Sequence, residues 1–489
     1  MSTTPLSSTD ESLWGPDLRP VMTALMSIVA IVSYNNLSVS AALPDVGDDL
    51  GQIELLPWVI TVELFTAAVA VLAAGPAVDG LGVRRTFRIT AVGFAATSLL
   101  VTVAPSMHTL LAARAVQGVF AGAVMTAAMA GVGVSVPARL RPRAFAAISA
   151  VWGVMGVAGP ALAATMVATV GWRGIFAANL PVTIVALLIG WGALPERQEG
   201  AARAPVDLIG LLIMALVTGA ALSLTTGQTG VMIAGAIVFI ASIAVYGTWA
   251  GRTPDPVVRI PHLVHERYRT VHLASIAVMG GAVGADAFLP LYVRAVRGGS
   301  QAVAAFSVLY LSIGWTASAW VSSRLQDRWP GEWVSLLGAV VAVPGAALVA
   351  FTVRIEAPMP VIYGSFVWLG AGVGLIVSTG AALLQNRTGL AEMGRVNGAH
   401  QFLRTIGITL GIAVVAAITF SVVDRRTGDV ESVRDLLSDD STVASVEVID
   451  AVADGYSLAL VVVVAIVAVT LPATLHLVRT RHQQLPSAT

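Results

Sequence analysis

The feature that most constrains this chain is a succession of apolar runs, each about as long as a lipid bilayer is thick. A helix needs roughly 20 mostly apolar residues to cross the hydrocarbon layer, and fourteen runs of about that length follow one another here. They lie at 20–43, 55–78, 87–105, 109–135, 144–168, 173–194, 207–226, 230–250, 270–293, 302–324, 333–353, 358–383, 398–422 and 455–478. The pattern predicts an all-α polytopic membrane protein.

Composition supports a membrane protein and argues against several other classes. Of the 489 residues, 56% are hydrophobic and 11% are charged, whereas soluble proteins carry about 25% charged residues. The net charge is zero, so no basic surface for nucleic acid is indicated. The sequence has no cysteine and none of the common phosphate-loop, zinc-protease or serine-hydrolase motifs. We therefore expect no enzyme, no metal and no cofactor, and an ion gradient as the energy source.

The arginines indicate the orientation of the spans. When the loops are assigned alternately to two sides, most arginines fall on one side, which the positive-inside rule places in the cytoplasm. Both termini are then cytoplasmic and the number of spans is even. The N-terminal residues lack the basic region and cleavage site of a secretory signal. We expect a multi-pass protein of the plasma membrane, with the lipid bilayer as its surroundings.

A faint repeat divides the chain. The segment SAALP at 40–44 returns as DAFLP at 286–290, and Asp79 is echoed by Asp327. Repeated helical halves are typical of secondary transporters. The expected parts are a cytoplasmic tail (1–19), an N-terminal six-helix half (20–194), two inserted spans with linkers (195–269), a C-terminal six-helix half (270–478) and a second cytoplasmic tail (479–489).

One long connection, 423–455, is acidic and lies on the outer side between the last two spans. It is either a solvated hairpin or short helix, or an outer lid or partner contact. The sequence leaves both open, and it also leaves open what the two inserted spans do.

The loop at 75–88 is richer in special residues than a simple turn requires. It carries Asp79, Gly82, Arg84 and Arg85 between two apolar runs. Glycines allow helix ends to approach closely, and an acid can cap or pair at a helix end. We interpret these four residues as a cytoplasmic conformational latch.

Several charged residues lie inside the predicted spans, and three of them are candidate functional residues. Glu63, Asp286 and Arg114 each sit among apolar neighbours, where an ionisable group is costly and marks a functional site. A carboxyl group binds a proton more readily in an apolar medium than in water, whereas a nearby cation favours its ionised form. Glu63 and Asp286 are therefore candidate proton carriers, tuned by Arg114. The alternatives are a neutral packing role for the acid and an arginine that reaches the interface.

The fifth apolar run carries small residues at helical spacing, Gly153, Gly156 and Gly159, followed by Pro160. Such residues allow close helix packing, and the proline kinks the helix. This packing either breaks and reforms during transport or is ordinary glycine-mediated packing.

Together these motifs resemble the major facilitator superfamily, in particular its fourteen-span drug:proton antiporter branch. The segment GPAVDGLGVRR is similar to the superfamily's loop between spans 2 and 3, and RAVQG, with Arg114, Gln117 and Gly118, is similar to its span 4 motif. The run from Gly153 to Pro160 resembles the antiporter motif. The acid usual in span 1 falls on Asn35, so the carboxyl group has moved to Glu63 in span 2.

The resemblance implies a monomeric proton-coupled exporter of small molecules in which two halves rock around a central cavity. The expected substrate residues share a polar or aromatic side chain near that cavity: Tyr34, Asn35, Asn36, Trp58, Gln117, Trp152 and Phe288. One alternative is an exporter of an endogenous lipid or metabolite, which a drug-susceptibility screen and lipid profile of a deletion strain would distinguish. Another is a non-transporting sensor or scaffold, which would show no proton-coupled uptake.

Overall fold

The computed structural model describes residues 12–196, 207–226, 228–428 and 445–481, and the regular elements in these ranges are all helices. Helix packing divides the chain into two compact units, residues 1–204 with 388–397 and residues 205–387 with 398–489. Most of the predicted outer loop lies outside the described residues. Its two ends are helical, because α16 continues to Thr427 and α18 begins at Val446.

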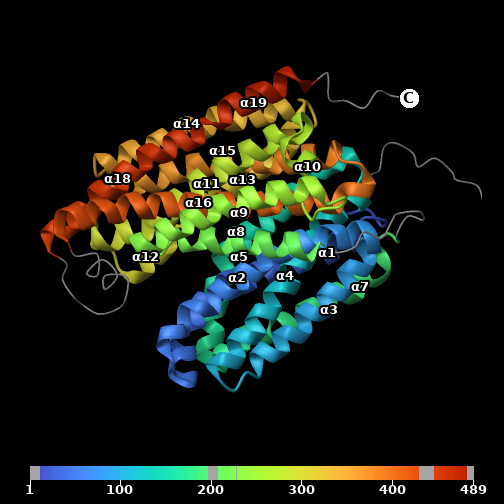
Figure 1. The fold of residues 1–489 in the computed structure, drawn as a ribbon, viewed down its shortest axis with the longest axis horizontal. Coiled ribbons are helices and arrows are strands. Elements are labelled where there is room, and N and C mark those ends of the chain that lie inside the picture. Colours follow the sequence, from blue (N-terminus) through green and yellow to red (C-terminus); the bar gives the residue numbers. More distant parts are fainter. Residues whose placement is uncertain (1–11, 197–206, 227, 429–444, 482–489) are drawn as a thin grey trace, which may run out of the picture. The chain divides into compact units, whose positions relative to one another are not determined.

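The described part of the first unit forms seven α-helices, and all except α6 are labelled in Figure 1. They are α1 (Arg19–Leu50), α2 (Leu56–Leu81), α3 (Val83–Thr102), α4 (Met107–Ser135), α5 (Arg141–Val170), α6 (Trp172–Ala177) and α7 (Asn179–Ala193). Short 3-10 turns precede α2 and α5, at Ile53–Leu55 and Ala138–Leu140, and a third, Leu390–Glu392, precedes α16. The closest packing is between α2 and α4, α3 and α4, and α1 and α5.

The second unit begins with two helices that pack chiefly against each other, α8 (Leu208–Ser223) and α9 (Thr229–Arg252). The others are α10 (Ile260–Val264), α11 (Glu266–Ala295), α12 (Gln301–Ser307), α13 (Leu309–Leu325), α14 (Gly331–Arg354), α15 (Met359–Asn386), α16 (Met393–Thr427), α18 (Val446–Ala468) and α19 (Thr470–Arg479). The first turn of α16 belongs to the first unit, and the rest of this helix to the second.

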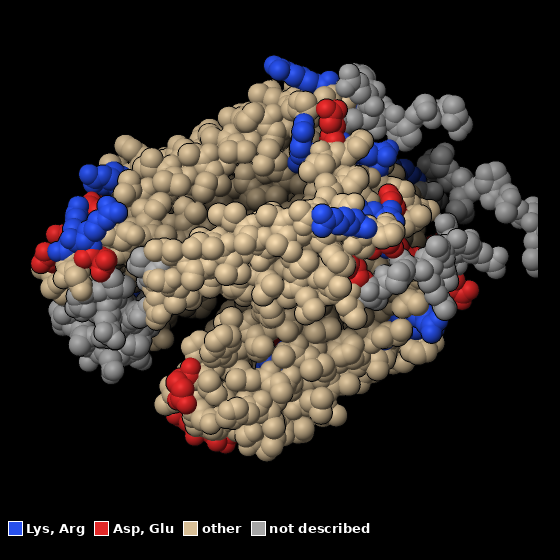
Figure 2. Space-filling model, viewed as in Figure 1, with Lys and Arg blue, Asp and Glu red and all other residues tan. Residues whose placement is uncertain are grey.

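Within the described residues, 11 helical segments are long and apolar enough to cross a membrane, or 12 when the two parts of the bent α5 count as one span. The arginines in the first turns of α3 lower its hydropathy, and α8 is shorter than a full span. On the face shown in Figure 2, charged side chains gather near the helix ends and leave the stretches between them uncharged. A multi-pass membrane protein requires this distribution.

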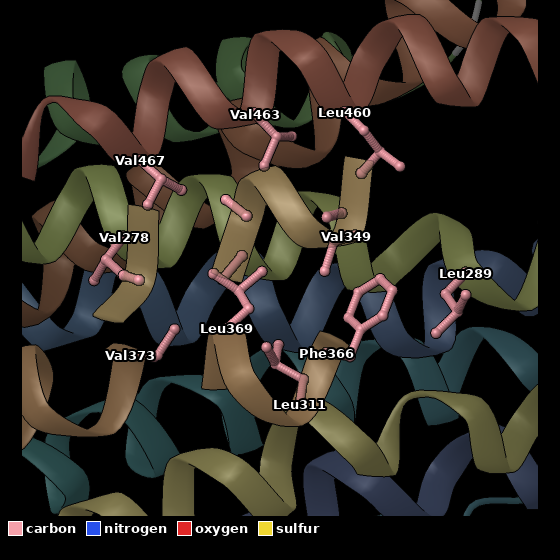
Figure 3. Packing of buried hydrophobic residues seen from close by; sticks show 14 of the residues in the cluster. Val278, Leu289, Leu311, Val349, Phe366, Leu369, Val373, Leu460, Val463 and Val467 are labelled. Carbon is pink, nitrogen blue, oxygen red and sulfur yellow. The ribbon is translucent and has the colours of Figure 1, made fainter. Parts of the chain in front are cut away.

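The core of the second unit is built mainly from apolar side chains of α11, α13, α14, α15 and α18. Val278, Leu311, Val349, Phe366 and Val463 are nearly inaccessible and converge between these helices (Figure 3). Many of the other buried positions are alanine. Lipid gives no hydrophobic drive for helices to associate, so close packing of small and branched side chains has to supply the attraction.

The faint sequence repeat corresponds to similar helices. Pro44 lies inside α1 and Pro290 inside α11, each shortly before the end of a long helix. Three predicted spans are each divided into two helices, α6 with α7, α12 with α13, and α18 with α19. α7 and α13, with 15 and 17 residues, are shorter than a full span, and each reaches that length only together with the short helix before it.

Candidate functional site

Arg114 on α4 is the centre of a buried polar network in the first unit. Its side chain is 1% exposed. Its Nε donates a hydrogen bond to the carbonyl of Val59 at 3.0 Å, and its Nη1 donates to Oε1 of Gln117 at 2.7 Å. Its Nη2 lies 3.7 Å from Oε2 of Glu63, which is also almost fully buried. The structure therefore joins the predicted acid of α2 to the predicted cation of α4.

Two glycines bring α2 and α4 close enough for this ion pair. A Cβ atom at Gly118 would collide with Thr66 and with the carbonyl of Glu63. A Cβ at Gly122, one turn further, would collide with the carbonyl of Ala67. Side chains four residues apart lie on the same helix face, so the spacing of these glycines creates one continuous seam beside the charged pair.

The network extends to two residues that the sequence did not single out as part of a site. Gln117 donates from Nε2 to Oγ of Ser98 on α3 at 2.8 Å. Asn179 on α7 donates from Nδ2 to Oδ1 of Asn35 on α1 at 3.1 Å and to Oγ of Ser98 at 3.3 Å. Five helices are thus tied to one arginine. The requirement that a buried guanidinium find acceptors could have directed attention to polar residues in neighbouring spans.

Glu63 keeps one carboxyl oxygen without a hydrogen-bond partner in the described part of the chain. This atom is Oε1, and it is inaccessible. The ring of Phe176 lies 5.5 Å from the Arg114 guanidinium and covers it. An ion pair in a low-dielectric setting is strongly coupled. Oε1 is thus the carboxyl oxygen of Glu63 that the described contacts leave unpaired.

Asp286 on α11 has a different environment in the second unit. Its Oδ1 is inaccessible and has no hydrogen-bond partner among the described residues. The hydroxyl of Tyr456 on α18 donates instead to the carbonyl of the preceding residue, Ala285, at 2.8 Å. Within the described ranges, Asp286 therefore lacks a cationic partner such as the one that Glu63 has in Arg114.

The second unit has its own arginine–glutamine pair, on α16. Arg404 donates from Nη1 to Oε1 of Gln401 at 2.7 Å, the same distance as between Arg114 and Gln117. Its Nε is buried and unpartnered in the described ranges. The two pairs thus share one contact, but only Arg114 is joined to an acid.

The residues expected to contact substrate are distributed over several environments. Asn35 and Gln117 are inaccessible and belong to the Arg114 network. Tyr34 is buried and donates its hydroxyl to Sδ of Met166 at 3.2 Å. Trp58 and Trp152 are exposed. Asn35 and Gln117 are thus inaccessible parts of a polar network, whereas the side chains of Trp58 and Trp152 are exposed.

The two remaining candidates lie in different units. Asn36 on α1 is half-buried, and its Oδ1 is an inaccessible atom without a hydrogen-bond partner in the described residues. Phe288 on α11 is half-buried and makes an edge-on contact with Phe420, with ring centroids 5.8 Å apart.

The predicted latch residues bind two different helix ends. Asp79 accepts hydrogen bonds from the backbone N–H groups of Gly394, at 2.6 Å, and Arg395, at 3.1 Å, in the first turn of α16. A Cβ atom at Gly75 would lie 2.9 Å from Cα of Arg395, so α2 and this turn are in close contact. The first N–H groups of a helix have no partner within the helix. Asp79 accepts hydrogen bonds from two of them, as an acid at a helix N-terminus does.

Arg84 acts on the C-terminal end of α7. It donates to the carbonyls of Leu194 and Gly192 and pairs with Glu196. A cation at a helix C-terminus interacts favourably with the helix dipole. Gly82 has φ +83°, a left-handed conformation that suits glycine, and ends α2. Arg85 is exposed.

In α5, Gly156 has no atom within 4 Å of its Cβ position, and Gly159 has only ordinary contacts with Leu37 and Ser38. The helix bends by 41° between residues 156 and 158. Pro160 explains this bend, because its ring clashes with the carbonyl four residues earlier, here that of Gly156. Gly153 lies on the same helix, one turn before.

Comparison with known proteins identifies the family. The sequence profile described as Major Facilitator Superfamily matches residues 23–412, most of the chain. This chain belongs to the Major Facilitator Superfamily. Members of this superfamily are transporters, the class that the sequence motifs predicted for this chain.

Relatives of this superfamily protein include transporters from bacteria. An uncharacterised MFS-type transporter of Mycobacterium tuberculosis is 29% identical over 430 residues, which are 85% of this chain and 62% of that protein. The chain thus spans less than two thirds of that relative. The multidrug transporter protein MdtP of Bacillus subtilis is 24% identical over 410 residues, 81% of this chain and 74% of its own length.

A solved structure has the same fold. The human organic anion transporter MFSD10 superposes with a TM-score of 0.64 at 15% sequence identity and covers 92% of this chain and 99% of its own. The similarity confirms an all-helical major facilitator fold, which the sequence motifs had predicted.

Proposed function

We propose that this superfamily member is a proton-coupled exporter of drugs or other amphipathic small molecules, working by alternating access. The observation that carries the proposal is that each unit has a carboxyl group well inside a long apolar helix, away from the helix ends. Glu63 is in the first unit and Asp286 is in the second. Ionisable residues inside spans are typical of proton and substrate pathways.

The surroundings of the two acids suggest different parts in coupling. Arg114 stabilises the ionised form of Glu63, so this acid can release a proton as well as bind one. Asp286 has no ion pair with a cation in the part of the chain that the structure describes, and its Oδ1 has no hydrogen-bond partner there. A proton or the cationic group of a substrate can neutralise it, and the two would then compete for this site.

The proposed substrate class rests on the relatives and on the aromatic candidates. The Bacillus subtilis relative is named as a multidrug transporter. Half-buried or exposed aromatic side chains such as Trp152 and Phe288 suit flat, amphipathic molecules. Asn36 would add a polar contact. We also propose fourteen spans with both termini in the cytoplasm, as the fourteen apolar runs and the arginines indicate.

Proteoliposomes containing the full chain test this proposal, with ethidium as the cationic probe. A pH gradient should drive ethidium transport, an uncoupler should abolish it, and Asp286→Asn should reduce it by about 100-fold, as loss of a proton-transfer group does. Asp48 is an exposed acid on α1 and provides the control, so Asp48→Asn should transport normally. Transport that the uncoupler leaves intact would contradict proton coupling.

A further inference from the structure

Two buried histidines that the proposed mechanism leaves unused meet in the second unit. His272 on α11 and His400 on α16 are 2% and 3% exposed. Their Nδ1 atoms are 2.9 Å apart, and their ring centroids are 5.1 Å apart. They are 128 residues apart in the sequence, so only the packing of α11 with α16 reveals the pair.

The hydrogen bonds assign the proton positions on both rings. Nε2 of His272 lies 2.9 Å from the backbone carbonyl of His262. A carbonyl can only accept, so this Nε2 must carry a hydrogen, and Nδ1 of the neutral His272 is then an acceptor. The hydrogen between the rings must therefore come from Nδ1 of His400. The remaining nitrogen of His400, Nε2, is left with a bare lone pair.

That lone pair is buried and unused. Nε2 of His400 is inaccessible and has no hydrogen-bond partner in the described part of the chain. No group of three or more His, Asp or Glu among the described residues could hold a metal ion, so a metal does not explain it. It is the one basic atom of the pair that can receive a proton while both existing hydrogen bonds remain.

We propose that His400 is a proton-binding residue of the transporter, that its Nε2 receives the proton, and that His272, held by the carbonyl of His262, is the residue that positions it. The proposal rests on the proposed proton-coupled function for its role in transport. After protonation, Nδ1 of His400 still donates to His272, now as a charge-assisted bond, which is the stronger kind.

The charged groups around the pair determine when the proton binds. The electrostatic neighbours of the two rings are His262 and, one turn further along α16, Arg404. Tyr268 packs near both His262 and His272, and donates its hydroxyl to the carbonyl of Arg387.

The Arg387 guanidinium does not add a free positive charge at that end of the cluster, because it is paired with Glu332 on α14 at 2.7 Å. Arg404 disfavours a second positive charge beside it, and burial adds to the cost. The arrangement of α10, α11 and α16 described above therefore suits neutral rings. Proton uptake at His400 should favour an opened arrangement in which Nε2–H gains an acceptor, and that opened form becomes more populated as the pH falls.

Nitrogen-15 NMR of the full chain in nanodiscs, with labelled histidine, tests the proton positions directly. At about pH 8, the signal lost in His400→Gln should come from a ring protonated at Nδ1. Because burial and Arg404 disfavour the charged ring, both its nitrogens should be protonated only at about pH 4, well below the ordinary histidine pKa of about 6.5. A His400 ring protonated at Nε2 at the higher pH, or still neutral at the lower pH, would overturn the proposal.

Two substitutions of His272 test its positioning role. His272→Gln keeps a donor for the His262 carbonyl and an acceptor for His400, so the Nδ1 tautomer of His400 should persist. His272→Phe removes both, so His400 should change to the Nε2 tautomer. An unchanged tautomer in His272→Phe would exclude positioning by His272.

Transport measurements separate this inference from the proposed function. His108 is exposed in the first unit and provides the control. In proteoliposomes with ethidium, His400→Gln should lose the wild-type dependence of transport on pH in the range where His400 titrates, and His108→Gln should keep it. An unchanged profile in His400→Gln would exclude a role in transport. Uncoupler-resistant transport by the wild type would instead refute proton coupling, and NMR would still decide on His400.

Discussion

The polar centres of the two units contrast with each other. In the first unit, Arg114 and Glu63 form a buried ion pair within a network that ties five helices together. In the second unit, Asp286 has no cation and Arg404 has no acid within the described residues, although Arg404 has a glutamine partner as Arg114 does. The same residue types are thus paired in one unit and separate in the other.

Glu63 therefore takes part in a contact that holds helices together, whereas Asp286 makes no such contact in the described residues. A charge that is buried and paired is costly to leave alone, so the first centre should contribute strongly to stability. A carboxyl group without partners contributes little to stability and is free to change its protonation. We therefore expect substitutions at the Glu63–Arg114 pair to lower stability more than substitutions at Asp286 do. We expect Asp286 substitutions to affect transport with little loss of stability.

The largest effect should come from removing each arginine in turn. Arg114→Met leaves Glu63 without its cation and should lower the free energy of unfolding by about 3–5 kcal/mol. Arg404→Met loses one hydrogen bond to Gln401 and should cost about 1 kcal/mol. Denaturant unfolding of the purified variants in detergent measures both. Equal losses of unfolding free energy in the two variants would contradict a stabilising role specific to the Arg114 ion pair.

Replacing the two acids tests whether stability depends on Glu63 more than on Asp286. Glu63→Gln removes the charge that Arg114 pairs with and should cost about 1.5–3 kcal/mol, the range for hydrogen bonds to charged groups. Asp286→Asn removes no partnered charge among the described residues and should cost less than Glu63→Gln. Unfolding and proton-driven ethidium transport, measured on the same preparations, show whether stability and activity separate. Full pH-driven transport by Glu63→Gln would refute a proton-carrying role for Glu63.

Close helix contact should prove equally necessary in both units. A Cβ atom at Gly284 would lie 2.7 Å from the carbonyl carbon of Gly411, and one at Gly122 would meet the carbonyl of Ala67. Gly284→Ala and Gly122→Ala should each cost about 1–3 kcal/mol through overpacking. Gly156→Ala is the control, because its Cβ would meet no atom within 4 Å. Thermal unfolding of the three variants tests the contrast.

We expect the smallest change in stability at Asp79 and Asp327, the two acids that the sequence repeat relates. Asp79→Asn removes the negative charge at the first turn of α16 and should cost about 0.3–1 kcal/mol, whereas Asp327→Asn alters an exposed side chain and should stay within about 0.5 kcal/mol. If Asp79 acts as a latch, its substitution should also slow turnover while ethidium binding stays normal. Lost binding at normal expression would contradict the latch.

The sequence alone predicted the membrane helices and their family. A span depends on the hydropathy of consecutive residues, and a motif such as Arg114 with Gln117 depends on the spacing within one helix. Both are local properties, so they could be identified before any contact was known. The same reasoning located Glu63, Asp286 and Asp79 as unusual residues, but not their partners.

Which of these residues are in contact depends on how the helices pack, and this is seen only in the tertiary structure. The ion pair of Glu63 with Arg114, the addition of Ser98 and Asn179 to that network, and the contact of His272 with His400 all join different helices. Such contacts depend on the rotation and close approach of packed helices, which glycines such as Gly118 permit and which hydropathy does not encode. For this reason the acids were visible in the sequence, whereas the difference between a paired and an unpaired acid was not.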